Sequence, residues 1–273
     1  MDKFSIFSAE DIIKKNTIKD INCAVVTGGA GRVGSVFSRI LLSNNIKVFC
    51  FSRSKKNFNS FKNSLSKSEQ KNLFFFKCDL SNLRNINQVI KKNNKILKNV
   101  DLLVNNGSSS FRGEYFNYSE SNIVLESKNM ILGTLYLTEK LLPILRKKKT
   151  TRIINVGSIW GFVSPKSKTY LDLNIGPTAV LAASKAGIEN YTKYLAAREA
   201  KNKIIVNNLI PGWFPRKGKV ENKKYVNEIK KNIPLNRLGR LDDLISPIYF
   251  LLSSGSNYYT GQNLVVDGGY TVY

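Results

Sequence analysis

The chain has 273 residues and a formal net charge of +24, from 43 Lys and Arg residues against 19 Asp and Glu residues. Hydrophobic residues make up 42% of it, so it can bury a sizeable core, and the composition excludes a disordered, collagen-like or disulfide-stapled protein. It has no histidine, which excludes a Ser-His-Asp triad and removes the commonest zinc ligand.

Predicted strands and helices alternate from one end of the chain to the other. The strands are short, continuous apolar runs, as expected when helices cover both faces of a sheet. We expect strands at 23–26, 47–51, 73–77, 102–105, 152–156, 204–209 and 263–266, and helices at 37–42, 86–97, 121–145, 178–200 and 241–253. This order predicts an α/β fold with a doubly wound parallel sheet, a Rossmann-type three-layer sandwich. We expect a single domain over residues 21–273, preceded by an N-terminal arm of residues 1–20.

Several features of the sequence bear on location and partners. No apolar run of about eighteen residues predicts a membrane span, and the first residues lack the apolar segment of a signal peptide. We therefore expect a cytoplasmic protein with no membrane partner. Cys23, Cys50 and Cys78 lie in apolar stretches without metal-ligand spacing, which indicates buried reduced thiols and no metal site. The lysines are scattered along predicted helix faces, so we expect solvated surfaces and no nucleic-acid partner.

A glycine-rich segment, TGGAGRVG at residues 27–34, joins the first predicted strand to the first helix. Glycines at such a junction allow a tight turn and let the backbone approach a pyrophosphate at the helix N-terminus. The alternative is a tight strand-to-helix turn that binds no ligand. Because the segment lies directly between a buried strand and a helix, we expect a dinucleotide to bind there. The expected cofactor contacts are Thr27, Gly28, Arg32, Val33 and Gly34.

The residues after the second predicted strand indicate which dinucleotide binds. A fold that prefers NAD usually has an acid here to accept hydrogen bonds from the ribose 2′-hydroxyl. This chain has Ser52 and Arg53 instead. The guanidinium of Arg53 can form paired hydrogen bonds with a 2′-phosphate, and Arg32 can approach the same phosphate. The sequence therefore favours NADP over NAD; the alternative is that both arginines are surface charges in a Lys-rich chain.

Motifs along almost the whole chain from residue 20 onwards resemble those of single-domain short-chain dehydrogenases/reductases. Residues 27–34 resemble the family's T-G-x-x-x-G-x-G, with Arg32 in place of the middle glycine. The other matching segments are 78–80 (CDL), 104–107 (VNNG), 155–158 (NVGS), 183–187 (ASKAG), 206–212 (VNNLIPG), 234–239 (PLNRLG), 259–263 (YTGQN) and 266–269 (VDGG). Their order along the chain makes the resemblance specific.

The resemblance implies an NADP-dependent oxidoreductase that interconverts a hydroxyl and a carbonyl on a small metabolite, with a sugar or polyol as the suggested type. In the family a Tyr exchanges the proton, a Lys one helical turn later lowers the pKa of that Tyr, a Ser orients the carbonyl and an Asn completes a proton relay. Ser158 and Lys185 match the Ser and the Lys. The family also implies a homodimer or homotetramer. The cofactor contacts that it implies are Asp79, Leu80, Asn105, Lys185, Pro211 and Gly212.

Two positions depart from the family's pattern. The Tyr should lie four residues before Lys185, where this chain has Leu181, and a leucine cannot transfer a proton. The Asn should lie three residues before Gly133, where this chain has Met130. Asn129 is adjacent, but on a regular helix it points about 100° away. The usual mechanism therefore cannot run.

Three hypotheses account for these departures. In the first, another group exchanges the proton: Tyr170, on a loop longer than the family's that also carries Asp172, or Lys185 itself when desolvated. The alternative for Tyr170, which the sequence favours, is a loop aromatic that packs on the substrate cleft or on a neighbouring subunit. In the second, the chain is a catalytically impaired paralogue that binds dinucleotide as a sensor or partner subunit. In the third, the basic surface binds nucleic acid or an anionic membrane, but residues 213–217 (WFPRK) are better explained as a lid over the substrate.

Overall fold

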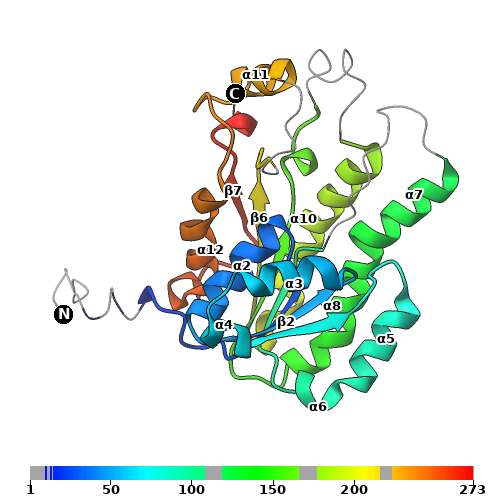
Figure 1. The fold of residues 1–273 in the computed structure, drawn as a ribbon, viewed down its shortest axis with the longest axis vertical. Helices are drawn as coiled ribbons and strands as arrows, with labels where there is room; N and C mark the ends of the chain where they lie inside the picture. Colours follow the sequence, from blue (N-terminus) through cyan, green and yellow to red (C-terminus); the bar gives the residue numbers. More distant parts are fainter. Residues whose placement is uncertain are drawn as a thin grey trace.

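The chain forms a central parallel sheet that helices cover on both faces (Figure 1). The structure is a computed structural model that describes Glu10, Ile13 and residues 15–107, 119–165, 177–215 and 223–272. Its strands lie in the order β3-β2-β1-β4-β5-β6-β7, so the chain first builds outwards from β1 in one direction and then in the other. The strands are β1 (Cys23–Thr27), β2 (Lys47–Ser52), β3 (Leu73–Lys77), β4 (Leu102–Asn105), β5 (Thr151–Val156), β6 (Ile204–Pro211) and β7 (Asn263–Val266). This confirms the predicted doubly wound α/β fold.

Helices connect the strands and supply the two outer layers. The longer helices are α2 (Arg32–Ser43), α3 (Lys55–Asn63), α5 (Leu83–Lys92), α7 (Glu120–Ser127), α8 (Gly133–Leu145), α10 (Ala179–Glu199), α11 (Lys223–Lys231) and α12 (Ile245–Leu252). Short helices are α4 (Lys67–Lys71) and α6 (Asn94–Leu97), and 3-10 turns occupy Ile159–Gly161, Ala200–Asn202, Leu241–Leu244, Ser254–Ser256 and Tyr270–Val272. Within the part of the chain that the structure describes, no helix combines the length and apolar character needed to cross a bilayer.

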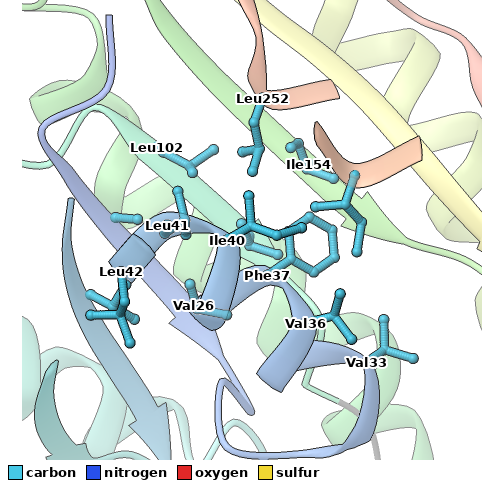
Figure 2. Close-up of a cluster of buried hydrophobic side chains, with 14 of the residues drawn as sticks. Val26, Val33, Val36, Phe37, Ile40, Leu41, Leu42, Leu102, Ile154 and Leu252 are labelled. Carbon is cyan, nitrogen blue, oxygen red and sulfur yellow. The ribbon is translucent and has the colours of Figure 1, made fainter. Parts of the chain in front are cut away.

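Each face of the sheet carries its own hydrophobic core. On one face, α2, α3 and α12 pack over the strands; Figure 2 shows Phe37, Ile40 and Leu41 of α2 gathered with side chains of the sheet and Leu252 of α12. On the other face, α5, α6, α8 and α10 contribute Ile86, Leu97, Leu137, Leu141 and Leu195. Both faces of the strands are therefore buried, which is why the strands are continuous apolar runs.

Polar groups tie together the amino ends of the strands. The carboxylate of Asp101 accepts hydrogen bonds from the backbone N–H groups of Asn22 (3.0 Å) and Cys23 (3.1 Å). Arg152, at the start of β5, is only 1% exposed, and its Nη2 donates to the carbonyl of Ser253 (3.1 Å) and to Oδ1 of Asn257. The buried guanidinium thus holds the segment after α12 against β5.

The structure corrects several predicted boundaries. The first helix begins at Arg32, within the glycine-rich segment 27–34 and five residues earlier than expected. The predicted helix 86–97 is two helices that share a boundary at Asn93, whose amide Nδ2 bonds to the carbonyl of Val89 and caps the first of them. The predicted helix 121–145 is interrupted by a π-helical turn, Lys128–Leu132. Of the predicted N-terminal arm, residues 1–9, 11, 12 and 14 lie outside the described residues.

Candidate active site

The glycine segment forms a tight turn against the first turn of α2. Gly28 has φ +61°, in the region that favours glycine, and its carbonyl accepts a hydrogen bond from the N–H of Gly31 (2.8 Å). A Cβ on Gly34 would lie 2.2 Å from that carbonyl, so only glycine fits there. Within the described residues, no side-chain hydrogen bond caps the N-terminus of α2 at Gly31, and the first N–H groups of a helix have no partner within the helix itself. Such a helix end suits the pyrophosphate of a dinucleotide.

Thr27 connects this turn to the end of β4. Its Oγ1 accepts hydrogen bonds from the N–H groups of Asn106 (2.9 Å) and Gly107 (2.7 Å) and donates one to the carbonyl of Val104 (3.2 Å). Asn106 donates from Nδ2 to the carbonyl of Thr27 (2.9 Å). Thr27 and Asn106 therefore set the shape of the glycine turn, and segment 104–107 (VNNG) was the sequence signal for Asn106.

A cavity of about 270 Å³ opens at the ends of β2 and β3. Its lining residues are Arg53, Lys77, Asp79, Asn82, Asn85 and Gln88. Asp79 is oriented by Ser81, whose N–H (3.0 Å) and hydroxyl (2.8 Å) both donate to its Oδ1. Arg53 and Lys77 give this cavity two cationic side chains. The sequence reasoning missed Lys77, and only its place two residues before Asp79 could have indicated it.

Arg32 lies elsewhere in the cofactor region. It is exposed on the first turn of α2 and does not line the cavity that contains Arg53. The idea that both guanidinium groups meet one phosphate stays a prediction. Val33, which follows it, is buried in the core on the α2 face, and Leu80 is buried in the opposite core. Both side chains pack in hydrophobic cores, and a cofactor contact from either stays a prediction.

Asn105 at the end of β4 belongs to a buried chain of polar side chains. Its Nδ2 donates to Oγ1 of Thr138 (2.9 Å) and to Oδ1 of Asn155 (2.9 Å). Asn155 in turn donates to Oγ1 of Thr192 (2.8 Å). Both amide hydrogens of Asn105 are thus used within the protein, and the chain links β4 and β5 to α8 and α10. A cofactor contact from this residue stays a prediction.

Lys185 lies inside the protein beside the end of β5. Its side chain is 7% exposed, and Nζ donates to the carbonyl of Val156 (2.6 Å). Burial lowers the pKa of Lys185 to about 8. Ser158, two residues beyond Val156, accepts a hydrogen bond from the N–H of Trp160 (3.3 Å). The structure therefore brings both predicted catalytic residues to the carboxyl end of β5, where α/β sheets bind ligands.

The position expected for the catalytic Tyr is apolar in its surroundings. Leu181 is partly buried and packs against a cluster that includes Trp160, Trp213 and Tyr270. Trp160 meets both of the other rings edge-to-face, at 5.9 and 5.8 Å between centroids. Tyr170 and Asp172, the loop residues considered as replacements, lie outside the described residues.

Asn129 and Met130 lie where the helix is not a regular α-helix. Both residues belong to the π-helical turn Lys128–Leu132. A π turn holds an extra residue, so the 100° step of an α-helix does not apply across it. Asn129 and Met130 are both buried, at 5% and 3% exposure, and Nδ2 of Asn129 donates to the carbonyl of Leu125 (2.9 Å).

The end of β6 packs closely against the segment after β7. Pro211 is the last residue of β6, and the N–H of Gly212 donates to the carbonyl of Val266 (2.9 Å). A Cβ on Gly212 would lie 2.7 Å from Cα of Asp267, so this glycine permits the close approach. Pro211 and Gly212 therefore lie at the carboxyl end of β6, the same end of the sheet at which Lys185 and Ser158 lie.

The sequence reasoning also missed a buried hydroxyl and carboxylate near Leu181. Thr178 caps α10: its Oγ1 accepts a hydrogen bond from the N–H of Leu181 (2.9 Å) and donates one to Oε2 of Glu126 (2.9 Å). Thr178 and Glu126 are each 2% exposed. A Thr placed directly before an apolar helical run is an N-cap signal, which could have found Thr178.

Comparisons with known proteins identify the family. A family model described as enoyl-(acyl carrier protein) reductase matches residues 33–271. The 7alpha-hydroxysteroid dehydrogenase of Bacteroides fragilis is 29% identical over 259 residues, which cover 91% of this chain and 94% of that protein. This chain belongs to the short-chain dehydrogenase/reductase family.

Solved structures share the fold of this short-chain dehydrogenase/reductase over nearly its whole length. A short chain dehydrogenase from Leptospira borgpetersenii with bound NAD+ is 26% identical, with a TM-score of 0.81 and coverage of 99% of each chain. RhlG of Pseudomonas aeruginosa, in an NADP active-site complex, is 23% identical, with a TM-score of 0.82 and coverage of 94% of this chain and 99% of that chain.

Proposed function

We propose that this short-chain dehydrogenase/reductase binds NADP(H) and interconverts a hydroxyl and a carbonyl on a small metabolite. The observation that carries the cofactor choice is Arg53, which follows β2 without an acidic neighbour and shares a cavity with Lys77. Two cations suit the 2′-phosphate that distinguishes NADP from NAD. NADP is named with RhlG and NAD+ with the Leptospira protein, so relatives alone do not choose between them.

In this proposal the remaining cofactor-binding residues lie at the carboxyl ends of the strands. Thr27, Gly28 and Gly34 shape the turn for the pyrophosphate, and Arg32 adds charge at the same helix end. Val33 packs in the core on the α2 face, behind the glycine turn, and Leu80 packs in the core on the opposite face, behind the turn after β3. Asp79 and Leu80 meet the adenine, and Asn105, Pro211 and Gly212 border the nicotinamide end. The bound nicotinamide supplies or accepts the hydride.

The residues of this chain orient the substrate beside that nicotinamide. The hydroxyl of Ser158 holds the substrate oxygen, and the buried ammonium of Lys185 places positive charge next to it. A positive charge stabilises the negative charge that develops on a carbonyl oxygen as it is reduced. The substrate is a small metabolite, with sugars and polyols as one class; a gluconate 5-dehydrogenase from Burkholderia cenocepacia, in complex with NADP and tartrate, shares the fold.

A titration of the purified protein with NADPH and with NADH tests the cofactor choice. Energy transfer from Trp160 and Trp213 to the reduced nicotinamide reports binding. We expect NADPH to bind more tightly, and Arg53→Asp to weaken its binding roughly ten- to a hundredfold, the equivalent of a charged hydrogen bond of about 1.5–3 kcal/mol. Lys56→Asp, an exposed charge change on neighbouring α3, is the matched control. Equal affinity for NADPH in wild type and Arg53→Asp refutes the assignment.

A second candidate function is that of a dinucleotide-binding paralogue without catalysis. The packing of Leu181 into the aromatic cluster and the burial of Met130 favour it, because both family positions for proton transfer are then apolar. Such a protein would act as a sensor or as a partner subunit. NADPH binding without oxidation of the bound NADPH by any added ketone would support this candidate.

We further propose a homodimer or homotetramer in a reducing, cytoplasmic setting. Exposed apolar side chains gather on the α7–α10 side, at Ile123, Val124, Leu125, Leu132 and Tyr194, and on the α12–β7 side, at Ile245, Phe250 and Val265. Two separate apolar faces suit two kinds of contact between copies of the chain. All three cysteines are unpaired and buried, which suits a reducing compartment. A solution mass from light scattering tests the assembly.

A further inference from the structure

Lysines that are scattered along the sequence meet at one end of the fold. The strands are all parallel, so the segments that lead into them lie together at the amino end of the sheet, opposite the end that holds Ser158 and Lys185. Figure 1 shows α4 and α6 at this lower end and α11 at the upper end. We call residues 15–22, 44–47, 67–72, 91–101, 146–150 and 199–203 the amino-end segments. Their lysines, all exposed except the half-buried Lys148, are Lys15, Lys19, Lys47, Lys67, Lys71, Lys91, Lys92, Lys95, Lys98, Lys147, Lys148, Lys149, Lys201 and Lys203.

Acidic side chains do not balance this charge. The acids of the amino-end segments are Asp20, Glu69, Asp101 and Glu199. Asp101 is buried and accepts backbone N–H groups, and Glu199 is buried and paired with two arginines. Glu69 forms the capping box of α4, so Asp20 is the exposed carboxylate that stays uncommitted in these described segments. The amino end of the sheet is therefore a surface of one sign, on which the lysines repel one another.

The positions of these lysines exceed what the helices themselves need. Burial raises the pKa of the Cys23 thiol to about 12 and the charge of Asp101 adds to the rise, while Lys47 and Lys148 oppose it. Lysines from two different connections thus flank the start of β1. The helix dipole favours a cation in the last turn of a helix. Residues 91–98 carry four lysines and residues 147–149 carry three, which is more than one cation for each helix end.

The chemistry of this surface fits anionic lipid better than nucleic acid. The amino-end segments contain no Phe, Tyr or Trp on which bases could stack. They are turns and helix ends, whereas a DNA groove is read by the side of a helix or by a strand ribbon. Lipid headgroups need only diffuse positive charge, and an apolar side chain beside it adds a second attraction. Ile96 of α6 supplies one, because it is 45% exposed between Lys95 and Lys98.

We propose that the amino end of the sheet binds the surface of an anionic membrane, with its lysines against the headgroups and Ile96 at the boundary between headgroups and acyl chains. The protein lies on the membrane and does not cross it. In this orientation the carboxyl ends of the strands, with Ser158 and Lys185, face away from the lipid. Membrane binding of this kind needs no dinucleotide, so it stands or falls separately from the oxidoreductase function.

Sedimentation of the full chain with lipid vesicles tests this surface. The vesicles are phosphatidylcholine alone, or phosphatidylcholine with about a third of phosphatidylglycerol. We expect binding to the anionic vesicles only, and its loss at about 0.5 M salt, where exposed charges are screened. The amino-end variant carries Lys91→Gln, Lys92→Gln, Lys95→Gln and Lys98→Gln. Its partition onto anionic vesicles should fall about fivefold for each lysine removed.

Matched variants separate the position of the charge from its amount. The control removes the same charge outside the amino-end segments, by Lys55→Gln, Lys56→Gln, Lys128→Gln and Lys231→Gln, and should stay within a few-fold of wild type. A second amino-end variant, with Lys147→Gln, Lys148→Gln and Lys149→Gln, serves if the first does not fold. Ile96→Ser should weaken the partition several-fold without changing its dependence on salt. Circular dichroism and urea unfolding show that each variant is folded.

Three results would overturn membrane binding at this end. One is a wild type that sediments with neither kind of vesicle, or equally with both. Another is a control variant that loses as much binding as the amino-end variant, since the net charge alone would then act. The third is tighter binding to a DNA duplex of about 30 base pairs than to anionic vesicles at the same salt, which would make nucleic acid the partner. A protein that binds the vesicles but neither NADPH nor NADH refutes only the proposed oxidoreductase.

Discussion

Oε1 of Glu189 lies so close to Gly161 that a Cβ on that glycine would be 2.3 Å from it. Glu189 is 9% exposed, and this buried oxygen has no hydrogen-bond partner among the residues that the structure describes. Burial raises the pKa of Glu189 from 4.5 to about 7, while the charge of Lys193 lowers it in part. A carboxyl group one turn after Lys185 therefore holds its proton to near-neutral pH.

Glu189→Gln should change stability in a pH-dependent way. Because the folded state binds this proton more tightly than the unfolded state, the free energy of unfolding falls as pH rises from 4.5 to about 7. The amide cannot ionise, so we expect the variant to gain about 1–2 kcal/mol over wild type at pH 8 and almost nothing near pH 4.5. Urea unfolding at both pH values measures this, with Glu120→Gln as the exposed control. Equal effects at the two pH values would contradict the titration of Glu189.

Lys185→Met should abolish turnover and raise the free energy of unfolding at pH 7. Below about pH 8 the folded protein carries a buried ammonium, which costs free energy that the unfolded chain does not pay. The free energy of unfolding of wild type therefore rises between pH 8 and pH 10.5. At pH 7 we expect the variant to be more stable by about 1–2 kcal/mol, despite losing the hydrogen bond to Val156, and to have no turnover. Thermal unfolding at pH 7 and pH 10.5 measures the difference, and the exposed change Lys193→Met is the control. A variant less stable than wild type at pH 7 would show that the hydrogen bond to Val156 contributes more free energy than burial of the ammonium costs.

Gly34→Ala should damage the cofactor turn. The added methyl would lie 2.2 Å from the carbonyl of Gly28 and 2.6 Å from Nδ2 of Asn106, and neither group can move without opening the turn. We expect a loss of about 1–3 kcal/mol in stability and at least a tenfold weaker NADPH affinity. Gly187→Ala is the control, since its methyl meets only the terminal Cδ1 of Ile131, at 2.7 Å. Tight NADPH binding by Gly34→Ala would show that the turn does not hold the pyrophosphate.

The sequence predicted what depends on local pattern and missed what depends on contacts between distant segments. The strands were predictable because Val25 or Leu103 must be apolar on a sheet covered on both sides, and the glycine segment because its turn has few solutions. The π turn at Asn129 was not predictable, because one extra residue in a helix leaves the spacing of its apolar residues almost unchanged. Lys77 and Glu126 were missed because their roles come from Arg53 and Thr178, which lie far away in the sequence. The candidacy of Lys185 followed from a motif, whereas its hydrogen bond to Val156 and its lowered pKa follow from packing.

The buried guanidinium of Arg152 also constrains when the protein can reach its final state during synthesis. Its two partners, Ser253 and Asn257, lie 101 and 105 residues further along the chain. A nascent chain that has emerged only as far as β6 would form β5 with that guanidinium at its start and neither partner present, and a charge buried without its partners costs several kcal/mol. The central sheet should therefore consolidate only when almost the whole chain has left the ribosome. Truncations that end before Ser253 should be captured by chaperones or degraded, even though all but one of the strands would be present in them.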